Sequence, residues 1–293
     1  MNIPRYWAKA ERLIQGGKAG AAAERHLIVW RGSDASAEDA QARAQRELEE
    51  RIARFRRGER LRDYPGHIRP LREPVIETVS APTGERIAVI TRNAAGCRVI
   101  NTAQVMFIDL DFASALVGDW RGALAALWRS IGGVSQAKAE PQERVLAKVR
   151  KWHEREASDW RVRVYRTRAG LRLLIAHGLF EPTSKDAQQV MTRLGADARY
   201  RRLCAVQACF RARLTPKPWR IGMARPPATY PWTNADEEAR QRAWESRYEA
   251  SIGRFAVCRL LADLGRQPLH PDAERVMRLH DAHTLSLMDK PLA

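Results

Sequence analysis

The sequence predicts an α+β fold with a largely antiparallel sheet. Its 293 residues are 45% hydrophobic and include nine tryptophans, which is typical of a folded globular protein. Several β-type segments are separated by short connections that contain Asn or Gly, as hairpins are. The expected order β-α-β-β-β-α-α-β-β-α-β mixes helices into these strands, which favours the α+β class. No Gly-x-Gly-x-x-Gly and no Walker-type phosphate loop is present, which argues against a Rossmann or P-loop nucleotide site.

The N-terminal part is expected to be a strand followed by a helix. Residues 26–30 (His-Leu-Ile-Val-Trp) form a β-type run. Ser33 and Asp34 are candidate helix caps, and residues 35–57 have the Ala, Glu and Arg content of a helix. The Pro- and Gly-containing segment 63–74 then predicts a loop or linker.

The rest of the chain supplies the core and a C-terminal region. The expected strands lie at residues 85–92, 97–101, 105–111, 162–165, 171–175 and 209–214. The expected helices lie at residues 119–130, 141–157, 184–194, 199–207, 235–250 and 271–287. Residues 255–261 are an apolar run that fits either type. We therefore expect a strand-helix extension (1–72), an α+β core (73–225) and a helical region (226–293), packed as one globular unit.

Net charge gives the first indication of a partner. Lys and Arg total 51 against 34 acidic residues, a formal net charge of +17, and the pI is near 10.5. Such an excess predicts a polyanionic partner, most often nucleic acid and less often an acidic membrane surface or an acidic protein. The alternative is an arginine bias of the whole proteome, which would raise the pI without any ligand.

The sequence carries no sign of export or of a membrane span. Its N-terminus lacks the apolar run of a signal peptide, and no stretch of about eighteen apolar residues exists. The four cysteines are scattered without zinc-ligand spacing, as free thiols of a reducing compartment are. We expect a cytoplasmic protein without a membrane partner.

Two carboxylates end the most apolar strand of the chain. Residues 105–112 read Val-Met-Phe-Ile-Asp-Leu-Asp-Phe. Because side chains alternate along a strand, Asp109 and Asp111 point to the same face, roughly 7 Å apart. Two like charges at the end of a core strand are costly unless a divalent cation lies between them, and Mg²⁺ or Mn²⁺ prefers such oxygen ligands. The alternative is that Phe107, Asp109 and Asp111 simply face solvent.

The predicted hairpin at residues 162–175 offers a candidate phosphate site. Thr167 and Gly170 lie in its tight turn, and Arg172 lies in the returning strand. A glycine there can let a phosphate approach backbone N–H groups, and an adjacent Arg can bind that phosphate with two hydrogen bonds. The alternative is an ordinary hairpin with surface arginines.

The most basic segment is residues 196–225, with eight Arg or Lys residues against one acid, a net charge of +7. Aromatic residues interleave with these cations, a combination that binds single strands by neutralising phosphates and stacking bases. Prolines stiffen the stretch 215–220. The residues expected to contact nucleic acid are Arg211, Arg213, Trp219 and Arg220, and Lys217 is expected to clamp phosphate. The alternative is a solvated basic face with Trp219 in the core.

These motifs together resemble the catalytic core of archaeo-eukaryotic primases and primase-polymerases. The resemblance covers roughly residues 85–215 and rests on Asp109 and Asp111 in the strand and on Thr167 and Gly170 in the hairpin. It implies an RRM-like sheet, a metal held by the two Asp residues, and a hairpin that binds the phosphates of an incoming nucleotide. The chain departs from the family at Arg172, where the family usually has His, and in lacking a clear third acid.

The leading hypothesis is a nucleic-acid-binding protein that carries out Mg²⁺- or Mn²⁺-dependent nucleotidyl or phosphoryl transfer. Its partners would be single-stranded DNA or RNA and a nucleoside triphosphate, with Asp109 and Asp111 as metal ligands and Arg172 and Lys217 as phosphate clamps. One alternative is a non-catalytic nucleic-acid-binding or assembly module with a structural Asp pair. Another is a basic interaction protein without a nucleic acid partner. His280, on the C-terminal helix, is expected to serve packing and capping.

Overall fold

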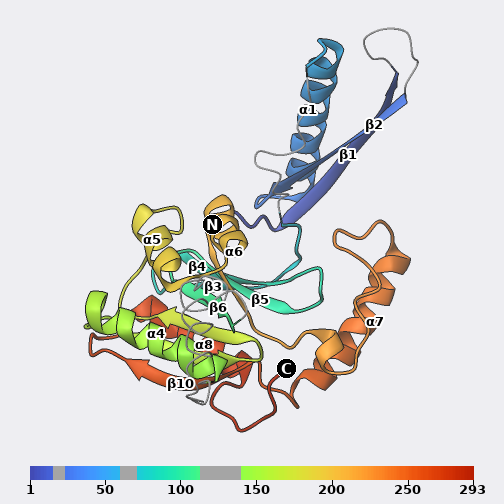
Figure 1. The fold of residues 1–293 in the computed structure, drawn as a ribbon. Coiled ribbons are helices and arrows are strands. Elements are labelled where there is room, and N and C mark those ends of the chain that lie inside the picture. Colours follow the sequence, from blue (N-terminus) through green and yellow to red (C-terminus); the bar gives the residue numbers. More distant parts are fainter. Residues whose placement is uncertain (16–23, 60–70, 113–139) are drawn as a thin grey trace, which may run out of the picture.

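The computed structural model describes residues 1–15, 24–59, 71–112 and 140–293. Within these residues the chain is α+β, with ten strands in three antiparallel sheets and six α-helices (Figure 1). The strands are β1 (Tyr6–Gln15), β2 (Glu24–Ser33), β3 (Val75–Ser80), β4 (Arg86–Arg92), β5 (Arg98–Thr102), β6 (Phe107–Asp111), β7 (Val162–Thr167), β8 (Gly170–Ile175), β9 (Phe210–Arg213) and β10 (Cys258–Leu264). The α-helices are α1 (Ala37–Arg56), α4 (Pro141–Glu156), α5 (Lys185–Leu194), α6 (Ala198–Gln207), α7 (Ala235–Ile252) and α8 (Pro271–Thr284). The predicted fold class is confirmed, and the expected helix 119–130 lies outside the described residues.

The N-terminal unit is a two-stranded hairpin with a helix on one face. β1 pairs with β2, and α1 covers the face that carries Ala10, Ile14 and Leu27. Figure 1 shows this unit extending away from the two larger sheets. The sequence predicted β2 and α1 but not β1. The buried residues of β1 are Ala10 and Ile14, with charged residues between them, so the strand lacks the β-branched run by which strands are recognised.

One four-stranded sheet has the order β3-β4-β5-β9. β4 and β5 form the predicted hairpin, with Ile90 opposite Ile100. β9 comes from a segment more than one hundred residues later and pairs with the free edge of β5. β3 was not expected, because its outer positions are polar and only its pairing with β4 gives it a place in a sheet.

The other four-stranded sheet has the order β10-β7-β8-β6, with every neighbouring pair antiparallel. The predicted hairpin β7–β8 lies at its centre. α4 and α5 cover one face, so the sheet has the layering that an RRM-like core requires. β10 shows that the C-terminal region, expected to be helical, also supplies a strand, and that the ambiguous run near residue 258 is β-structure.

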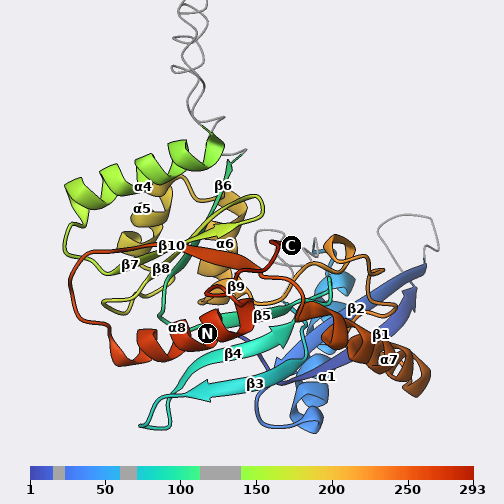
Figure 2. The ribbon, with the colours of Figure 1, turned by 90° about the horizontal axis from the view of Figure 1, so that it is seen from below.

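Both faces of this sheet are covered. Ile108 and Leu110 of β6 pack in the core beneath α4 and α5. Phe107 packs in a second core, formed by the two four-stranded sheets and α8, and Figure 2 shows α8 and α4 on opposite sides of the sheet. Asp109 and Asp111 share the face of Phe107. This face is buried at Phe107 and exposed by Asp111, so the Asp pair lies where the space between the sheets opens to solvent.

None of the helices in the described part of the chain is both long enough and apolar enough to cross a membrane.

Candidate functional site

Asp109 is bound by a buried arginine from the neighbouring strand. β6 and β8 pair so that Asp109 lies opposite Arg172. The Arg172 Nε and Nη2 groups donate to the two Asp109 carboxylate oxygens at 2.7 and 3.1 Å, and Nη1 donates to the Arg213 carbonyl at 2.8 Å. The Arg172 side chain is 3% exposed, whereas that of Asp109 is 40% exposed.

This pair gives Arg172 a different task from the predicted one. Burial opposes the charged guanidinium, but the adjacent Asp109 carboxylate more than offsets this and raises the pKa of Arg172. All three nitrogens of the guanidinium are engaged, and the side chain is closed to solvent. A phosphate could reach Arg172 only by displacing Asp109. In this geometry Arg172 positions the Asp109 carboxylate and does not clamp phosphate.

His280 extends this arrangement from the far end of the chain. The fully buried imidazole lies 3.4 Å from Arg172 Nη1 through Nε2 and 3.1 Å from an Asp281 carboxylate oxygen through Nδ1. Asp281 in turn accepts a hydrogen bond from Arg163 at 2.5 Å. The sequence assigned His280 to packing, and its 108-residue separation from Arg172 left no local signal that could have joined the two.

Asp111 is the exposed member of the Asp pair. Its carboxylate makes no hydrogen bond or ion pair with any residue that the structure describes. Partial burial and then the carboxylates of Asp109 and Asp197 raise the pKa of Asp111 above its ordinary value. Lys217 and Arg220 oppose this rise, so both cations lie near the carboxylate. Asp111 is therefore a carboxylate that a cation would stabilise.

The donor set fits a hard divalent cation held in part by the protein. Two carboxylates on one strand face offer oxygen ligands, and Mg²⁺ is often bound by one or two carboxylates together with waters and substrate phosphates. In residues 1–15, 24–59, 71–112 and 140–293, no group of three or more His, Cys, Asp or Glu side chains is placed to hold a metal ion. Asp109 and Asp111 would thus be the protein's ligands, with Asp109 also bound by Arg172.

Neutralising Asp111 should stabilise the protein. Because its pKa is raised in the folded state, the stability that this group contributes is present below its unfolded pKa and is lost as the pH rises through the folded value. Asp111→Asn should therefore increase the free energy of unfolding at pH 7 by a few tenths of a kcal/mol, given solvent screening, and the gain should vanish near pH ~3. Urea unfolding at both pH values measures this. Asp159→Asn, another exposed carboxylate, is the control, and a loss of stability in Asp111→Asn at pH 7 would contradict the interpretation.

The hairpin residues Thr167 and Gly170 hold β8 against its neighbours. Thr167 Oγ1 donates to the Gly170 carbonyl at 3.1 Å. A Cβ at Gly170 would lie 2.0 Å from the Leu110 carbonyl oxygen, so the close approach of the β6 backbone requires glycine here. Packing thus accounts for Gly170 without a phosphate, and phosphate binding by Thr167 and Gly170 stays a prediction.

A basic group from the 213–220 segment lies beside the Asp pair. Burial and then Arg213 and Arg220 lower the pKa of Lys217. Burial and then Arg168 lower the pKa of Arg220. We call Arg168, Lys217 and Arg220 the basic cluster. The positive charge of Arg220 lowers the pKa of Lys217, and that of Arg168 lowers the pKa of Arg220, because these cations lie close together. Such closeness is the electrostatic condition that favours an anionic ligand.

Trp219 lies on the short 3₁₀ turn Pro218–Arg220 and is 45% exposed. Lys217 Nζ lies 5.5 Å and Arg225 Cζ lies 4.9 Å from the centre of its ring. The structure therefore places the predicted Lys217, Trp219 and Arg220 together on the surface. An exposed indole flanked by cations can stack on a nucleobase.

The other two predicted nucleic-acid contacts, Arg211 and Arg213, are not exposed. The Arg211 side chain is buried, and its Nη2 donates to both carboxylate oxygens of Glu73 at 2.9 Å. The prediction that Arg211 contacts nucleic acid is wrong. Its guanidinium instead joins β9 to the segment before β3 through Glu73. Arg213 is half-buried and donates to the Thr215 carbonyl at 3.1 Å. Burial, and after it the positive charges of Arg172 and Arg220, lower the pKa of Arg213.

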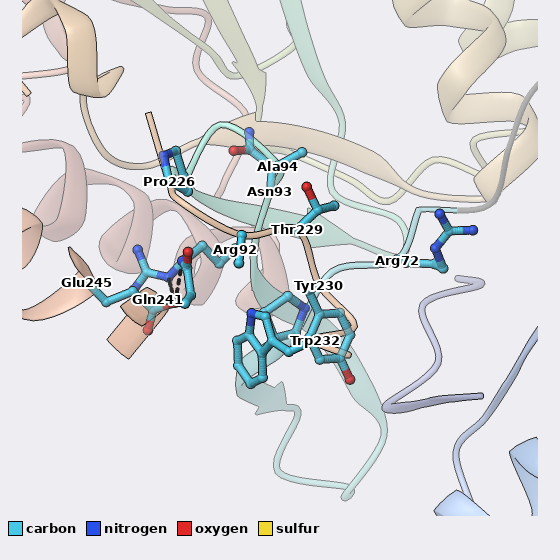
Figure 3. A pocket seen from close by; sticks show the side chains of 12 residues that line it. Arg72, Arg92, Asn93, Ala94, Pro226, Thr229, Tyr230, Trp232, Gln241 and Glu245 are labelled. Atoms are coloured by element: carbon cyan, nitrogen blue, oxygen red, sulfur yellow. Dashed lines mark hydrogen bonds and ion pairs between the residues drawn. The ribbon is translucent and has the colours of Figure 1, made fainter. Parts of the chain in front are cut away.

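A small recess lies between the β4–β5 turn and the segment before α7 (Figure 3). Arg92 forms an ion pair with Glu245 at 3.2 Å, and Gln241 donates to the same carboxylate at 3.0 Å. The cavity measures about 20 Å³, which is room for about one water molecule. It is too small for a nucleotide, and its contacts anchor α7 to the β3–β4–β5–β9 sheet.

No protein-family model, no curated protein and no solved structure matches this chain. The resemblance to primases therefore rests on the short motifs alone.

Proposed function

We propose that the chain binds single-stranded nucleic acid and a nucleoside triphosphate beside a divalent cation, and catalyses nucleotidyl or phosphoryl transfer. One observation carries the proposal: Asp111, without a described partner and with a raised pKa, lies next to Asp109 and within the influence of Lys217 and Arg220. A phosphoryl-transfer site needs carboxylates that hold a metal ion and basic side chains that bind the phosphates, and here the two lie side by side.

Each side chain has a task in this proposal. Bound Mg²⁺ or Mn²⁺ would neutralise charge on the phosphate oxygens. Asp109 and Asp111 hold the cation, and Arg172 fixes the orientation of Asp109 from the buried side. Lys217 and Arg220 attract the phosphates, and Trp219 offers an exposed ring to a base.

Binding of a labelled single-stranded oligonucleotide tests the nucleic-acid half of the proposal. Affinity should fall linearly in log–log form as salt rises, and Lys217→Ala with Arg220→Ala should reduce the slope by about 2 because two phosphate contacts are lost. Trp219→Ala should weaken binding by roughly five- to 150-fold, equivalent to about 1–3 kcal/mol, without changing the slope. Fluorescence anisotropy between about 50 and 200 mM salt covers the range in which such contacts are screened.

The matched control removes two cations elsewhere. Arg150→Ala with Lys151→Ala takes the same charge from the exposed face of α4. If this control flattens the slope as much as the Lys217 and Arg220 variant does, binding is diffuse and the basic cluster is not the site. Absence of binding near 50 mM salt would remove nucleic acid as the partner.

A non-catalytic nucleic-acid-binding module is the second candidate. It is favoured by the commitment of Asp109 to Arg172 and by the absence of a third suitably placed acid among the described residues. Calorimetry with a nucleoside triphosphate and Mg²⁺ separates the candidates. Saturable heat that Lys217→Ala abolishes supports the enzyme, and no heat at millimolar nucleotide leaves the module.

A further inference from the structure

A recess of about 510 Å³ lies between α4, the segment that follows β8, and α5, on the helical side of the β10–β7–β8–β6 sheet. Asp109 and Asp111 belong to the opposite face of that sheet, so the recess is separate from the candidate site. Its volume suits a small ligand or a single side chain of a partner. Aromatic and acidic side chains line it: Trp152, Trp160, Phe180, Glu156, Glu181 and Asp186.

The aromatic walls meet at steep angles. Trp152 and Trp160 have ring centres 6.0 Å apart and planes at 83°. Trp160 and Phe180 have ring centres 5.3 Å apart and planes at 51°. These three rings lie in contact with one another and line the recess, and an aromatic ring attracts an ammonium group that comes within about 6 Å of its face.

Neighbouring residues fix the positions of Trp160 and Phe180, so the recess is already formed in the free protein. His177 packs on Trp160 with ring centres 4.6 Å apart. The Trp160 carbonyl is 2.9 Å from His153 Nε2, and the Phe180 N–H donates to the Gln104 carbonyl at 2.8 Å. A preformed site loses little conformational entropy on binding.

The charge of the recess is opposite to that of the chain. Three carboxylates line it, and Arg193 is its one arginine among the described lining residues. Arg193 forms an ion pair with Glu156. Glu181 and Asp186 have no ion-pair partner among the residues that the structure describes, so the recess keeps negative charge on a protein whose formal net charge is +17. Phosphate-bearing ligands would be repelled here, and cations would be attracted.

We propose that this recess binds an organic cation, an alkylated ammonium group, with Trp160 and Phe180 against its methyl groups and Glu181 and Asp186 neutralising its charge. A purely apolar ligand would gain nothing from the carboxylates. A small inorganic cation would gain little from the rings. Only a ligand with both properties uses the whole lining.

Choline and its uncharged isostere 3,3-dimethylbutan-1-ol test the proposal by calorimetry. Choline should bind saturably and about tenfold more tightly than the isostere, because only the cation interacts with the ring quadrupoles and the carboxylates. Glu181→Gln with Asp186→Asn, both exposed positions that should leave the fold intact, should remove most of this preference. Glu154→Gln, an exposed acid of α4 outside the lining, should leave it unchanged.

Equal binding of choline and the isostere, or no binding of either, overturns the proposal. A preference that survives in the double variant overturns it as well. A peptide with one trimethylated lysine identifies the source of the cation. Tighter binding of the peptide than of choline assigns the recess to a modified protein partner, and the reverse order assigns it to a free small molecule.

Discussion

Replacing Asp109 by alanine should lower the free energy of unfolding by about 3–5 kcal/mol, because it leaves a buried guanidinium without its counter-charge. Arg172 is 3% exposed and donates two hydrogen bonds to this carboxylate, so water cannot replace the lost partner. Urea unfolding followed by circular dichroism measures the loss.

The reverse substitution should cost less. In Arg172→Met the remaining charge belongs to Asp109, whose side chain is 40% exposed and can be hydrated. The double variant Asp109→Ala with Arg172→Met should recover much of the stability lost in Asp109→Ala alone, since no unpaired buried charge is left. Asp111→Ala is the matched control, and equal losses in Asp109→Ala and Asp111→Ala would show that the ion pair does not support the sheet.

Replacing Gly170 by alanine should destabilise the protein by about 3 kcal/mol or more. The added Cβ would lie 2.0 Å from the Leu110 carbonyl oxygen. A backbone oxygen cannot rotate away as a flexible side chain can, so the β6–β8 pairing must shift. The expected result is a lower midpoint of urea unfolding.

Gly178→Ala is the control for this substitution. Gly178 has open space around an added Cβ, so its replacement should change stability by no more than about 0.5 kcal/mol. If Gly170→Ala changes stability as little as Gly178→Ala, the close approach of β6 to the hairpin is not what requires glycine. The predicted phosphate contact would then be the better reason for glycine at this position.

The centre of the fold could be predicted from the sequence because its signals are local. The β6 run Phe107–Asp111 and the hairpin of β7 and β8 are rich in apolar and β-branched residues, and a glycine borders the hairpin turn. β1 and β10 could not be assigned in this way. β1 acquires its strand character from pairing with β2, and β10 from pairing with β7 across a long stretch of chain.

The candidate site was predicted in part for the same reason. Asp109 and Asp111 share a face by simple alternation, and Lys217, Trp219 and Arg220 are close in the sequence. Ion-pair partners from distant segments carry no such signal: Glu73 is 138 residues from Arg211. A guanidinium that looks free for phosphate in the sequence can be neutralised by a carboxylate that only the fold brings to it.

The cation site can be tested directly by titrating Mn²⁺ into the protein and following the electron paramagnetic resonance signal of the free ion. The wild type should deplete this signal at one saturable site, and Asp111→Asn should not, while Asp159→Asn should behave as the wild type. Asp111→Asn is the informative variant because it leaves the Asp109–Arg172 ion pair intact. An undiminished free-ion signal with the wild type, or equal depletion by Asp111→Asn, would contradict a cation site at the end of β6.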